Sequence, residues 1–492
     1  MLNALKYGKV SANSLGQGMS TARKSSKKIP MSRVDNAWLR MERPTNLMMI
    51  TGVMMFETPV NITRLKKVIK ERFMAYPRFR QKVHESATGT FWQDDADFDL
   101  DWHVRLSALP GKADKQALER FVSLLASTPL DKTKPLWQFH LVEKYDGGSA
   151  LITRIHHCYA DGIALVQVLL SMTDSEAKPG KDKTLAKTWL KNDGKAVHER
   201  MGAIGRYMKM GENLLEKGMD FYRDPTLANV VAKEGTEIAR ELAYALSLSD
   251  DPETVLRGRL GVSKRVAWAP PLPLEDVKAI SRVFDATVND VLMASMAGAL
   301  RSYMIERGEQ IDGLTIRATV PVNLRPLEHA KKLGNHFGLV FLDLPVGEPH
   351  PVLRLVRVVE CMKQLKQSRQ AIVAFGLLAA LGMTPPGVQQ IALELFSRKA
   401  TTVATNVPGP QMPLYLAGEK IKEQMFWVPQ TGSIGLGVSI LSYNGNVHFG
   451  LIADAKLMPD PDAVIQRFIP EFEKLLYIAL MGDWGESARN QA

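Results

Sequence analysis

Two adjacent histidines, His156 and His157, end an apolar run, and Asp161 and Gly162 follow four and five residues after the second. Imidazole has an ordinary pKa of about 6.5, so it can take and return a proton near neutral pH. Neighbouring side chains on a strand point to opposite faces, so one histidine of the pair can face a given cavity. We therefore expect one histidine to do acid–base chemistry and the other to have a structural role.

Other chemistries fit this stretch less well. A metal site is disfavoured because the two imidazoles point apart and no neighbouring cluster of Cys or His completes a set of ligands. Cys158 offers an acyl-enzyme route as an alternative, but its neighbour on the strand, His157, is badly placed to activate it. In a purely structural interpretation, both histidines are hydrogen-bonded core residues and Asp161 only caps a helix.

The elements that must position the motif follow from the spacing of apolar residues. Residues 135–145 and 147–157 are predicted to be two strands of a hairpin that turns at Asp-Gly-Gly. A helix is predicted from Asp161 to about Met172, with Ile163, Val166 and Leu170 on its buried face. An acidic side chain suits the start of a helix, and Gly162 without a Cβ lets a ligand or backbone come close.

The rest of the chain alternates strands and helices in two similar halves. In the first half we expect a strand over Leu47–Phe56, a helix ending before Pro77, and a helix over 115–130. In the second half we expect two helices broken near 285–287, with Thr287 and Asp290 in a capping box, and strands over 315–324 and 334–346. A hairpin turning at Asn444-Gly445 and a helix over 461–480 complete the chain.

Composition is that of a folded globular protein, with 492 residues, 45% hydrophobic and 23% charged. This length predicts two domains, which we divide as follows: a basic disordered tail at 1–30, a first domain at 31–175 carrying the histidine motif, a helical crossover linker at 176–265 and a second domain at 266–492. Two cysteines make no disulfide framework, which suits a reducing cytoplasm. No secretory signal is evident, and the most apolar window, 371–383, is too short to span a bilayer.

Further landmarks accompany the His-His-x-x-x-Asp-Gly motif in a fixed order. They are "LRMERPTNLMM" from Leu39, "PLW" from Pro135, "TVNDVLMA" from Thr287, "RATVPVNLRP" from Arg317, "GNHFG" from Gly334 and "TNVPGP" from Thr405. Together they resemble the bacterial wax ester synthase/acyl-CoA:diacylglycerol acyltransferase family, part of the superfamily of chloramphenicol acetyltransferase and peptide-synthetase condensation domains. The resemblance extends from about Ser32 to Leu480.

The resemblance implies an α/β fold of two chloramphenicol-acetyltransferase-like sandwich domains that form a pseudo-dimer with a tunnel between them. It implies an O-acyltransferase that moves a long-chain acyl group from acyl-CoA to a fatty alcohol, giving a wax ester, and secondarily to diacylglycerol. His157 would be the general base, and His156 and Asp161 would hold the strand end and the loop. No cofactor is implied, since acyl-CoA is a substrate.

The resemblance also assigns supporting positions. Asn289 would hydrogen-bond the oxyanion or orient the acceptor, and Gly162 would leave room for the thioester arm. Trp137 and Glu42 would shape or orient the site. Residues Asn406 to Pro410 would form a turn at the domain interface. A tunnel for alkyl chains gains about 0.8 kcal/mol per buried methylene, so we expect broad tolerance of chain length.

Very apolar products suggest a cytoplasmic enzyme that associates peripherally with the inner membrane or with lipid droplets. The first 33 residues carry seven of the +11 net charges and no acidic residue, so this tail can contact anionic lipid or can simply aid solubility. No nucleic-acid motif accompanies it. Two alternatives stay open: condensation-type transfer from a carrier protein, and a non-catalytic lipid-droplet-binding protein.

Overall fold

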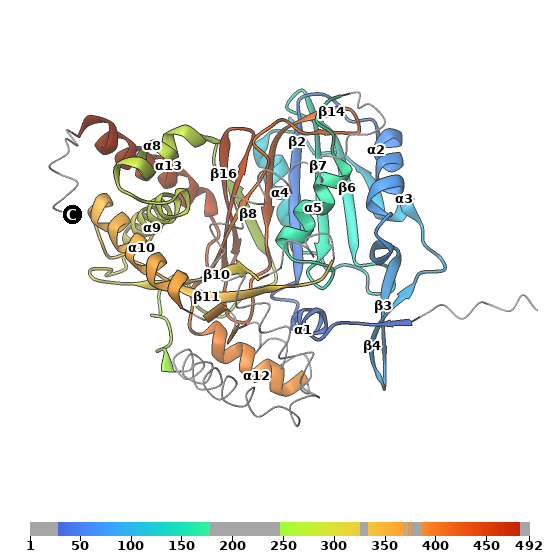
Figure 1. The fold of residues 1–492 in the computed structure, drawn as a ribbon, viewed down its shortest axis with the longest axis horizontal. Helices are drawn as coiled ribbons and strands as arrows, with labels where there is room; N and C mark the ends of the chain where they lie inside the picture. Colours follow the sequence, from blue (N-terminus) through green and yellow to red (C-terminus); the bar gives the residue numbers. More distant parts are fainter. Residues whose placement is uncertain are drawn as a thin grey trace, which may run out of the picture.

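Two large β-sheets, each with helices packed on it, form the centre of the molecule (Figure 1). The computed structural model describes residues 28–177, 247–324, 333–374 without 369 and 372, and 386–482. Residues 178–246 of the crossover predicted over 176–265 therefore lie outside the described residues, as do most of the apolar window 371–383 and the tail up to residue 27.

The first sheet has six strands in the order β13-β14-β2-β7-β6-β5. Its strands are β2 (Met49–Phe56), β5 (Val104–Ser107), β6 (Trp137–Tyr145), β7 (Gly148–His156), β13 (Tyr415–Leu416) and β14 (Glu419–Trp427). Because side chains alternate along a strand, the two faces of this sheet bury different helices. Met54 and Leu151 pack toward α5 (Gly162–Met172), whereas Val53 and Ile152 pack toward α4 (Lys115–Ala126).

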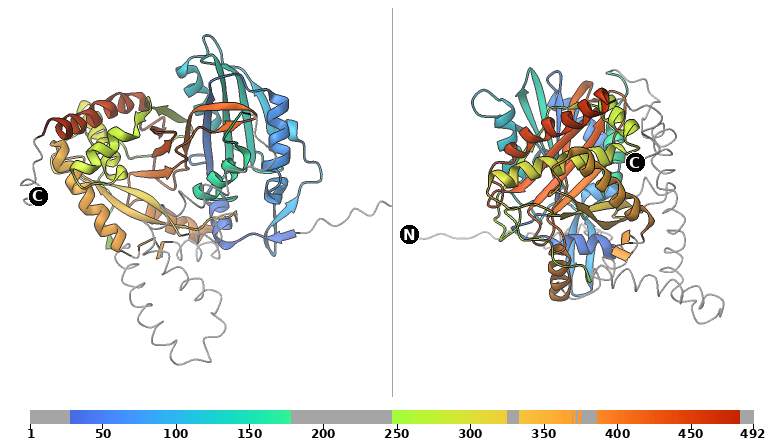
Figure 2. Two further views of the ribbon diagram at one scale, coloured as in Figure 1. Left: turned by 45° about the horizontal axis from the view of Figure 1, so that its top comes forward. Right: turned by 90° about the vertical axis from the view of Figure 1, so that its left-hand side faces the viewer.

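The second sheet has seven strands, in the order β11-β10-β12-β15-β16-β8 with β9 also paired to β16. Its strands are β8 (Lys264–Trp268), β9 (Leu272–Pro273), β10 (Ile316–Asn323), β11 (Phe337–Leu344), β12 (Thr402–Pro408), β15 (Leu436–Tyr443) and β16 (Asn446–Asp454). Four helices gather on its outer side, with α13 and α9 lying across the strands (Figure 2): α8 (Leu274–Val283), α9 (Val288–Glu306), α10 (Pro351–Gln367) and α13 (Pro461–Met481). Their apolar side chains form one large core with the sheet.

Smaller elements frame the first sheet. A three-stranded sheet joins β1 (Lys28–Pro30), β4 (Gly89–Asp94) and β3 (Gln81–Ser86). The short helices are α1 (Arg33–Met41), α2 (Ile62–Val68) continued by the π-helix η1 (Ile69–Phe73), the 3₁₀ helix η2 (Pro77–Arg80), α3 (Leu100–His103) and α12 (Pro386–Ser397). Helix α1 lies below the first sheet in Figure 1, beside the end of β7 that carries the histidines.

Local sequence signals account for most of these elements. The predicted hairpin before the motif turns at Asp146 and Gly147, whose φ angles are 47° and 77°, and Asn444 and Gly445 repeat this geometry with 48° and 77°. The predicted capping box of α9 is confirmed, since Thr287 and Asp290 exchange side-chain and backbone hydrogen bonds.

Three predicted boundaries need correction. Lys28–Pro30 pair with β4, so these last three residues of the disordered tail predicted for 1–30 belong to the folded structure. The predicted boundary between linker and second domain, at 265 and 266, cuts through β8. Strands β13 and β14 belong to the second half in sequence but pair within the first sheet, with β14 beside β2. Which strands pair across a long connection depends on long-range contacts, and the residue pattern of a single strand does not reveal it.

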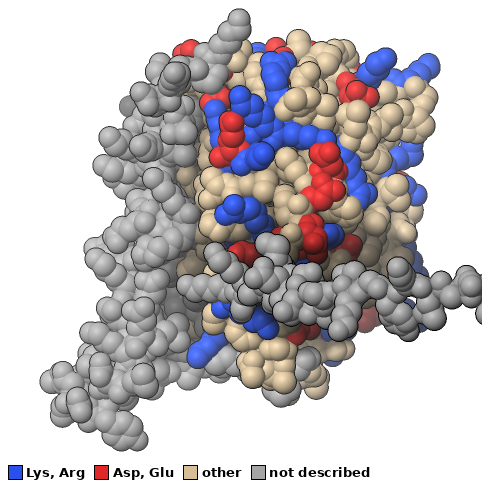
Figure 3. Space-filling model, turned by 90° about the vertical axis from the view of Figure 1, so that its right-hand side faces the viewer, with Lys and Arg blue, Asp and Glu red and all other residues tan. Residues whose placement is uncertain are grey.

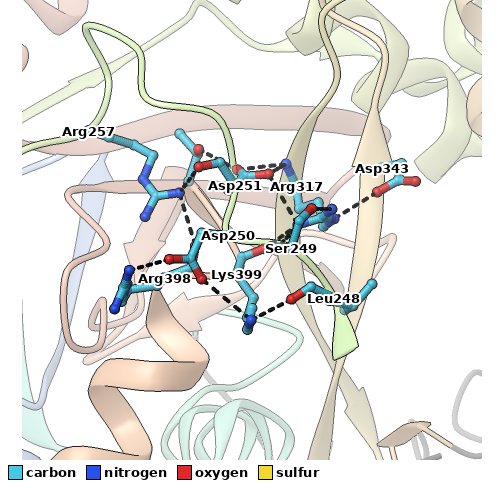
Figure 4. Close-up of polar contacts among 10 residues, drawn as sticks. Leu248, Ser249, Asp250, Asp251, Arg257, Arg317, Asp343, Arg398 and Lys399 are labelled. Atoms are coloured by element: carbon cyan, nitrogen blue, oxygen red, sulfur yellow. Dashed lines mark hydrogen bonds and ion pairs between the residues drawn. The ribbon is translucent and has the colours of Figure 1, made fainter. Parts of the chain in front are cut away.

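A polar cluster surrounds Asp250 and Asp251, in the segment before β8 (Figure 4). Buried Asp251 accepts hydrogen bonds from the backbone N–H of Arg317 at 3.1 and 3.0 Å and from the hydroxyl of Thr401. Burial raises the pKa of Asp251 although these donors oppose the rise. Neighbouring Asp250 pairs with Arg398 and Lys399. The cluster therefore connects Asp250 and Asp251 to Arg317 on β10 and to Thr401 directly before β12, and it has a structural role.

Among the described residues, no single helix is long and apolar enough to cross a membrane. The pair α8 and α9 reaches that length and hydropathy when taken together, but the two helices are bent by 96°.

Candidate active site

His156, the last residue of β7, is held by its neighbours on all sides. The backbone N–H of Cys158 donates to its Nδ1 at 3.1 Å, which leaves the hydrogen of the neutral ring on Nε2. Nε2 lies 3.2 Å from Oε2 of Glu42, within ion-pair range, although the angle is not that of a hydrogen bond. Burial opposes ionisation of Glu42, but His156 and Lys132 prevail and lower the pKa of its carboxyl. His156 thus has the structural role predicted for one histidine.

His157 follows in the turn and is held differently. Its ring stacks on the indole of Trp38, with centroids 4.1 Å apart and planes inclined by 18°, and Phe337 lies 5.6 Å away. Its backbone N–H donates to the carbonyl of Met48 at 2.7 Å. Its Nδ1 is buried with no hydrogen-bond partner in the described structure. Backbone bonds and ring stacking, not a carboxylate bonded to the ring, therefore fix the orientation of this imidazole.

Burial changes the acidity of His157. Desolvation lowers the pKa of this imidazole to about 4, and the nearby charge of Asp161 opposes the shift only in part. This value lies below the ordinary pKa of about 6.5 for an imidazole. The ring is neutral at pH 7, as a proton acceptor must be, and its protonated form is a strong acid.

Asp161 joins two distant segments at this turn. Its Oδ1 accepts the N–H of Ala164 at 2.9 Å, which makes it the predicted N-cap of α5. Its Oδ2 accepts the N–H of His336 at 2.9 Å, and its own N–H donates to the carbonyl of Gly334 at 3.2 Å. Gly334 has a φ of 116°, which few residues other than glycine adopt. The "GNHFG" segment is thereby fastened to the histidine motif.

Helix α1 completes the support through a buried carboxylate. Asp35 accepts the N–H of Asn335 at 3.2 Å and its amide N–H at 2.8 Å, and the same amide donates to the carbonyl of His157 at 2.8 Å. Burial raises the pKa of Asp35, although Ser32, Asn335 and Arg78 act against the rise. We call Asp35, Asn335 and the His157 carbonyl the backbone clamp. With Trp38, the clamp holds His157 from two positions on α1.

An apolar cavity begins next to the motif. It lies between α5 and the face of the first sheet that carries Thr153 and Ile155, and the ends of β12 and β15 contribute Val407 and Leu441. Its empty volume is about 940 Å³, including space open to solvent. His157 follows β7 in the turn, two residues beyond Ile155, which lines the cavity. The cavity therefore runs from the neighbourhood of His157 along α5.

Comparison with known proteins gives this site a family. Residues 31–292 match the model of the wax ester synthase/diacylglycerol acyltransferase catalytic domain, and residues 333–476 match that of the WS/DGAT C-terminal domain. The chain belongs to the wax ester synthase/diacylglycerol acyltransferase family. A probable diacylglycerol O-acyltransferase of Mycobacterium tuberculosis is 30% identical over 378 residues, 75% of this chain and 77% of the relative. The O-acyltransferase WSD of Acinetobacter baylyi is 25% identical over 87% of this chain and 93% of the relative.

Solved structures agree on the fold. The wax ester synthase/diacylglycerol acyltransferase of Marinobacter aquaeolei VT8 superimposes with a TM-score of 0.63 at 22% identity, over 92% of this chain and 99% of that one. The first condensation domain of the calcium-dependent antibiotic synthetase gives 0.57 at 15% identity, over 92% and 97%. The predicted fold class is confirmed. The predicted family and class of enzyme, an O-acyltransferase, are confirmed by the family models and the named relatives.

The structure brings some of the predicted site residues together. Glu42, His156, His157 and Asp161 all lie at the strand end, and Gly162 lines the cavity. A Cβ built on Gly162 would meet Val407 at 3.9 Å, an ordinary contact, so the glycine leaves open space between the two halves of the molecule. These placements agree with roles in holding the motif and leaving room for a ligand, and those roles stay predictions.

Trp137 and Asn289 have other partners. Trp137 is fully buried, stacks on His103 at 4.3 Å and donates its indole N–H to the carbonyl of Phe79 at 2.8 Å. Its described contacts are those of a core residue at the start of β6. Asn289 begins α9 and accepts a hydrogen bond from the amide of Asn406 at 3.1 Å. This bond links α9 to the "TNVPGP" strand, whose Val407 lines the cavity.

Cys158 is a poor nucleophile in this setting. It is fully buried, and burial raises the pKa of its thiol well above the ordinary value. Since the thiolate is the reactive form, the acyl-enzyme alternative lacks an activated nucleophile here. No group of three or more potential metal ligands occurs in the part of the chain that the structure describes.

Sequence reasoning missed several residues of the site. Trp38, Asp35, Asn335 and Phe337 contact the motif, although none was assigned a role beforehand. The "GNHFG" landmark did point to Asn335 and Phe337 as members of a family pattern. Nothing in the sequence shows that this segment would dock against a turn roughly 175 residues earlier in the chain, where the bond between His336 and Asp161 forms.

Proposed function

We propose that this protein transfers a long-chain acyl group from acyl-CoA to a fatty alcohol, and secondarily to diacylglycerol, with His157 as the general base. The acceptor hydroxyl gives its proton to the imidazole while its oxygen attacks the thioester carbonyl. The tetrahedral intermediate collapses, the C–S bond breaks, and the imidazolium returns the proton to the CoA thiolate. The products are one ester and one CoA thiol, and the base ends unchanged.

The observation that supports this role is the neutral, oriented imidazole of His157 beside the apolar cavity. Its pKa of about 4 keeps it unprotonated at pH 7, and the imidazolium formed during attack is acidic enough to protonate a leaving thiolate. The cavity offers apolar walls for alkyl chains, worth about 0.8 kcal/mol per buried methylene. Asn289 and Asn406 are candidates for contacts to the oxyanion or the acceptor.

This function is tested by measuring ester formation with two different acceptors and without an acceptor. Purified protein is given palmitoyl-CoA with hexadecanol, with dioleoylglycerol, or with neither, and both CoA thiol and lipid product are quantified. We expect CoA release only with an acceptor, and one ester per CoA. Protein inert with both acceptors but active with a carrier-bound acyl group would support condensation-type transfer. Protein inert with every donor would favour a lipid-binding role.

The pH profile follows from the low pKa of His157. Catalysis needs the neutral imidazole, so kcat/KM should stay nearly flat from about pH 7.5 to 5.5 and should fall only as the pH approaches 4. An acidic limb with a midpoint near 6.5 would contradict the buried, desolvated base.

Folding must be followed at each pH, because acid also affects stability. Burial lowers the pKa of His103, His140 and His448, like that of His157, to about 4. Between pH 6.5 and 4 the unfolded chain therefore binds more protons at these groups, and the free energy of unfolding falls as the pH falls. Buried Asp35, Glu119 and Asp251 have raised pKa values and offset part of this loss.

We further propose that the enzyme works in the cytoplasm at the surface of the inner membrane or of lipid droplets. Helix α12 supports this, because Val388, Ile391 and Leu395 are exposed on it at helical spacing. The face in Figure 3 carries Lys and Arg interspersed with Asp and Glu. Flotation with anionic liposomes at low salt tests the proposal, and protein that stays at the bottom of the gradient would contradict it.

A further inference from the structure

Gln424 is a polar side chain in the wall of the apolar cavity. It is 4% exposed, and within the described structure its amide makes no hydrogen bond. Two other buried glutamines do bond: the amide of Gln389 donates to the carbonyl of Ala37 at 2.9 Å, and that of Gln81 donates to Asp94 at 3.0 Å. Buried Gln167, on α5, has no partner for either amide atom within the described structure. An amide that makes no hydrogen bond within the protein is satisfied from outside the described chain, either by water or by a ligand in the cavity.

The register of the first sheet shows where this amide points. Gln424 on β14 is opposite Met54 on β2, and Met54 is opposite Leu151 on β7. Phe426, Gly52 and Thr153 form the next row, and all three line the cavity. Residues two apart on a strand share a face, so Gln424 is on the same face as Phe426 and projects into the cavity beneath α5.

Gln424 is at the end of the cavity remote from the reaction. Its row contains Leu151, six residues before His157 on the same stretch of chain, which is about 20 Å at the rise of a strand. Helix α5 lines the cavity between Gly162 and Met172, about 15 Å at the helical rise. An extended chain advances about 1.2 Å per bond, so a substrate carbon near Gln424 is roughly 16 bonds from the reacting carbonyl.

We propose that Gln424 is a specificity-determining residue that binds an oxygen near the distal end of a long-chain substrate. The amide N–H groups can donate to a ketone or hydroxyl oxygen that would otherwise be buried without a partner. The substrate class is then a long acyl or alkyl chain oxygenated in its last few carbons. This inference rests on the proposed function, because it takes the cavity to hold the substrate chain that reacts at His157.

The alternative for Gln424 is hydration by a trapped water, which would give no selectivity for oxygenated chains. The two differ in what an apolar replacement does. Gln424→Met keeps the length of the side chain and removes its donors, so it should favour plain chains and penalise oxygenated ones. Thr153 is the other uncharged polar side chain in the cavity wall and is nearer to His157, so Thr153→Val serves as the matched control.

The experiment has two arms, each of which compares kcat/KM for an oxo substrate with that for the plain substrate. In the donor arm, 15-oxohexadecanoyl-CoA is compared with hexadecanoyl-CoA, with hexadecanol as acceptor. In the acceptor arm, 15-oxohexadecan-1-ol is compared with hexadecan-1-ol, with hexadecanoyl-CoA as donor. A ketone is used because it cannot itself act as an acceptor. In one of the two arms we expect the oxo-to-plain ratio to fall about tenfold in Gln424→Met, the effect of one hydrogen bond. Thr153→Val should leave that ratio near the wild-type value.

Equilibrium binding of 15-oxohexadecanoic acid and hexadecanoic acid to the wild type and to Gln424→Met gives the same comparison without turnover. This separates the inference from the proposed function: loss of acyl transfer leaves the binding preference measurable. A wild type that prefers the oxo acid while Gln424→Met does not supports the inference. Equal ratios in both proteins, in both rate arms and in binding, would overturn it and leave a water on the amide.

Discussion

Replacing His157 with alanine should lower kcat for ester formation by at least about 10²-fold, the lower range of a positioned general base. The variant keeps the cavity and the cap of α5, so substrate can still bind. The hydroxyl of the alcohol, however, has no base to take its proton. We expect KM to change less than kcat, since the proton transfer occurs in the transition state. Steady-state assays of CoA release together with product analysis measure the effect.

His448→Ala is the matched control for this variant. His448 is also buried, and burial also lowers its pKa to about 4, but it lies on β16 in the second sheet. Both substitutions remove a buried imidazole and create similar voids, so both should reduce the free energy of unfolding. Only His157→Ala should lose catalysis. If the two variants lose activity in parallel, the effect of His157 is one of stability and the assigned role is wrong.

Replacing Asp35 with alanine should both destabilise the protein and slow it. The substitution removes the acceptor for two N–H groups of Asn335, and each buried donor left unsatisfied costs about 1–3 kcal/mol. Asn335 also bonds the carbonyl of His157, so the backbone clamp loosens where the base is held. We expect about 2–4 kcal/mol less free energy of unfolding in urea, and a lower kcat in the fraction that stays folded.

Asp35→Asn separates the two contributions. The asparagine keeps one acceptor oxygen for Asn335, so it should recover part of the stability and of kcat. The pH at which activity falls should move in Asp35→Ala if the His157 ring changes its surroundings. Wild-type stability and turnover in Asp35→Ala would show that the clamp has no influence on the site.

Local patterns in the sequence were sufficient for the elements around the motif. The Asp-Gly turn before β7, the cap at Asp161 and the capping box of α9 each involve residues within a few positions of one another. Their geometry is set by backbone preferences and short-range hydrogen bonds, which a single sequence displays. The expectation that His156 and His157 differ agrees with their different partners, although His157 lies in the turn and strand alternation does not extend to it.

Long-range contacts were beyond such reasoning. The clamp joins Asp35, Asn335 and His157 across some 300 residues of chain. The insertion of β14 beside β2 depends on pairing across the whole molecule. The pKa of His157 depends on how deeply Trp38 and Phe337 bury the ring, and the partnerless amide of Gln424 depends on a cavity. These are properties of packing, which composition and periodicity do not specify.

The family landmarks identified segments near the site that periodicity did not, but they gave no physical reason for their importance. "GNHFG" marked a segment as important, and the structure supplies the reason: Gly334 takes a positive φ, Asn335 reaches two partners and Phe337 flanks the imidazole. For "PLW" the described contacts of Trp137 are those of the core, and Trp137 begins β6, the strand that pairs with β7. This landmark therefore supports the strand that leads into the motif.

In the proposed mechanism acyl transfer is direct, with His157 as base and no covalent enzyme intermediate. Rapid-quench mixing of the protein with radiolabelled palmitoyl-CoA in the absence of an acceptor tests it most directly. We predict no burst of CoA and no label on the protein until hexadecanol is added, when CoA and ester appear together. One equivalent of CoA released at once, with label retained on denatured protein and lost in Cys158→Ala, would contradict the claim.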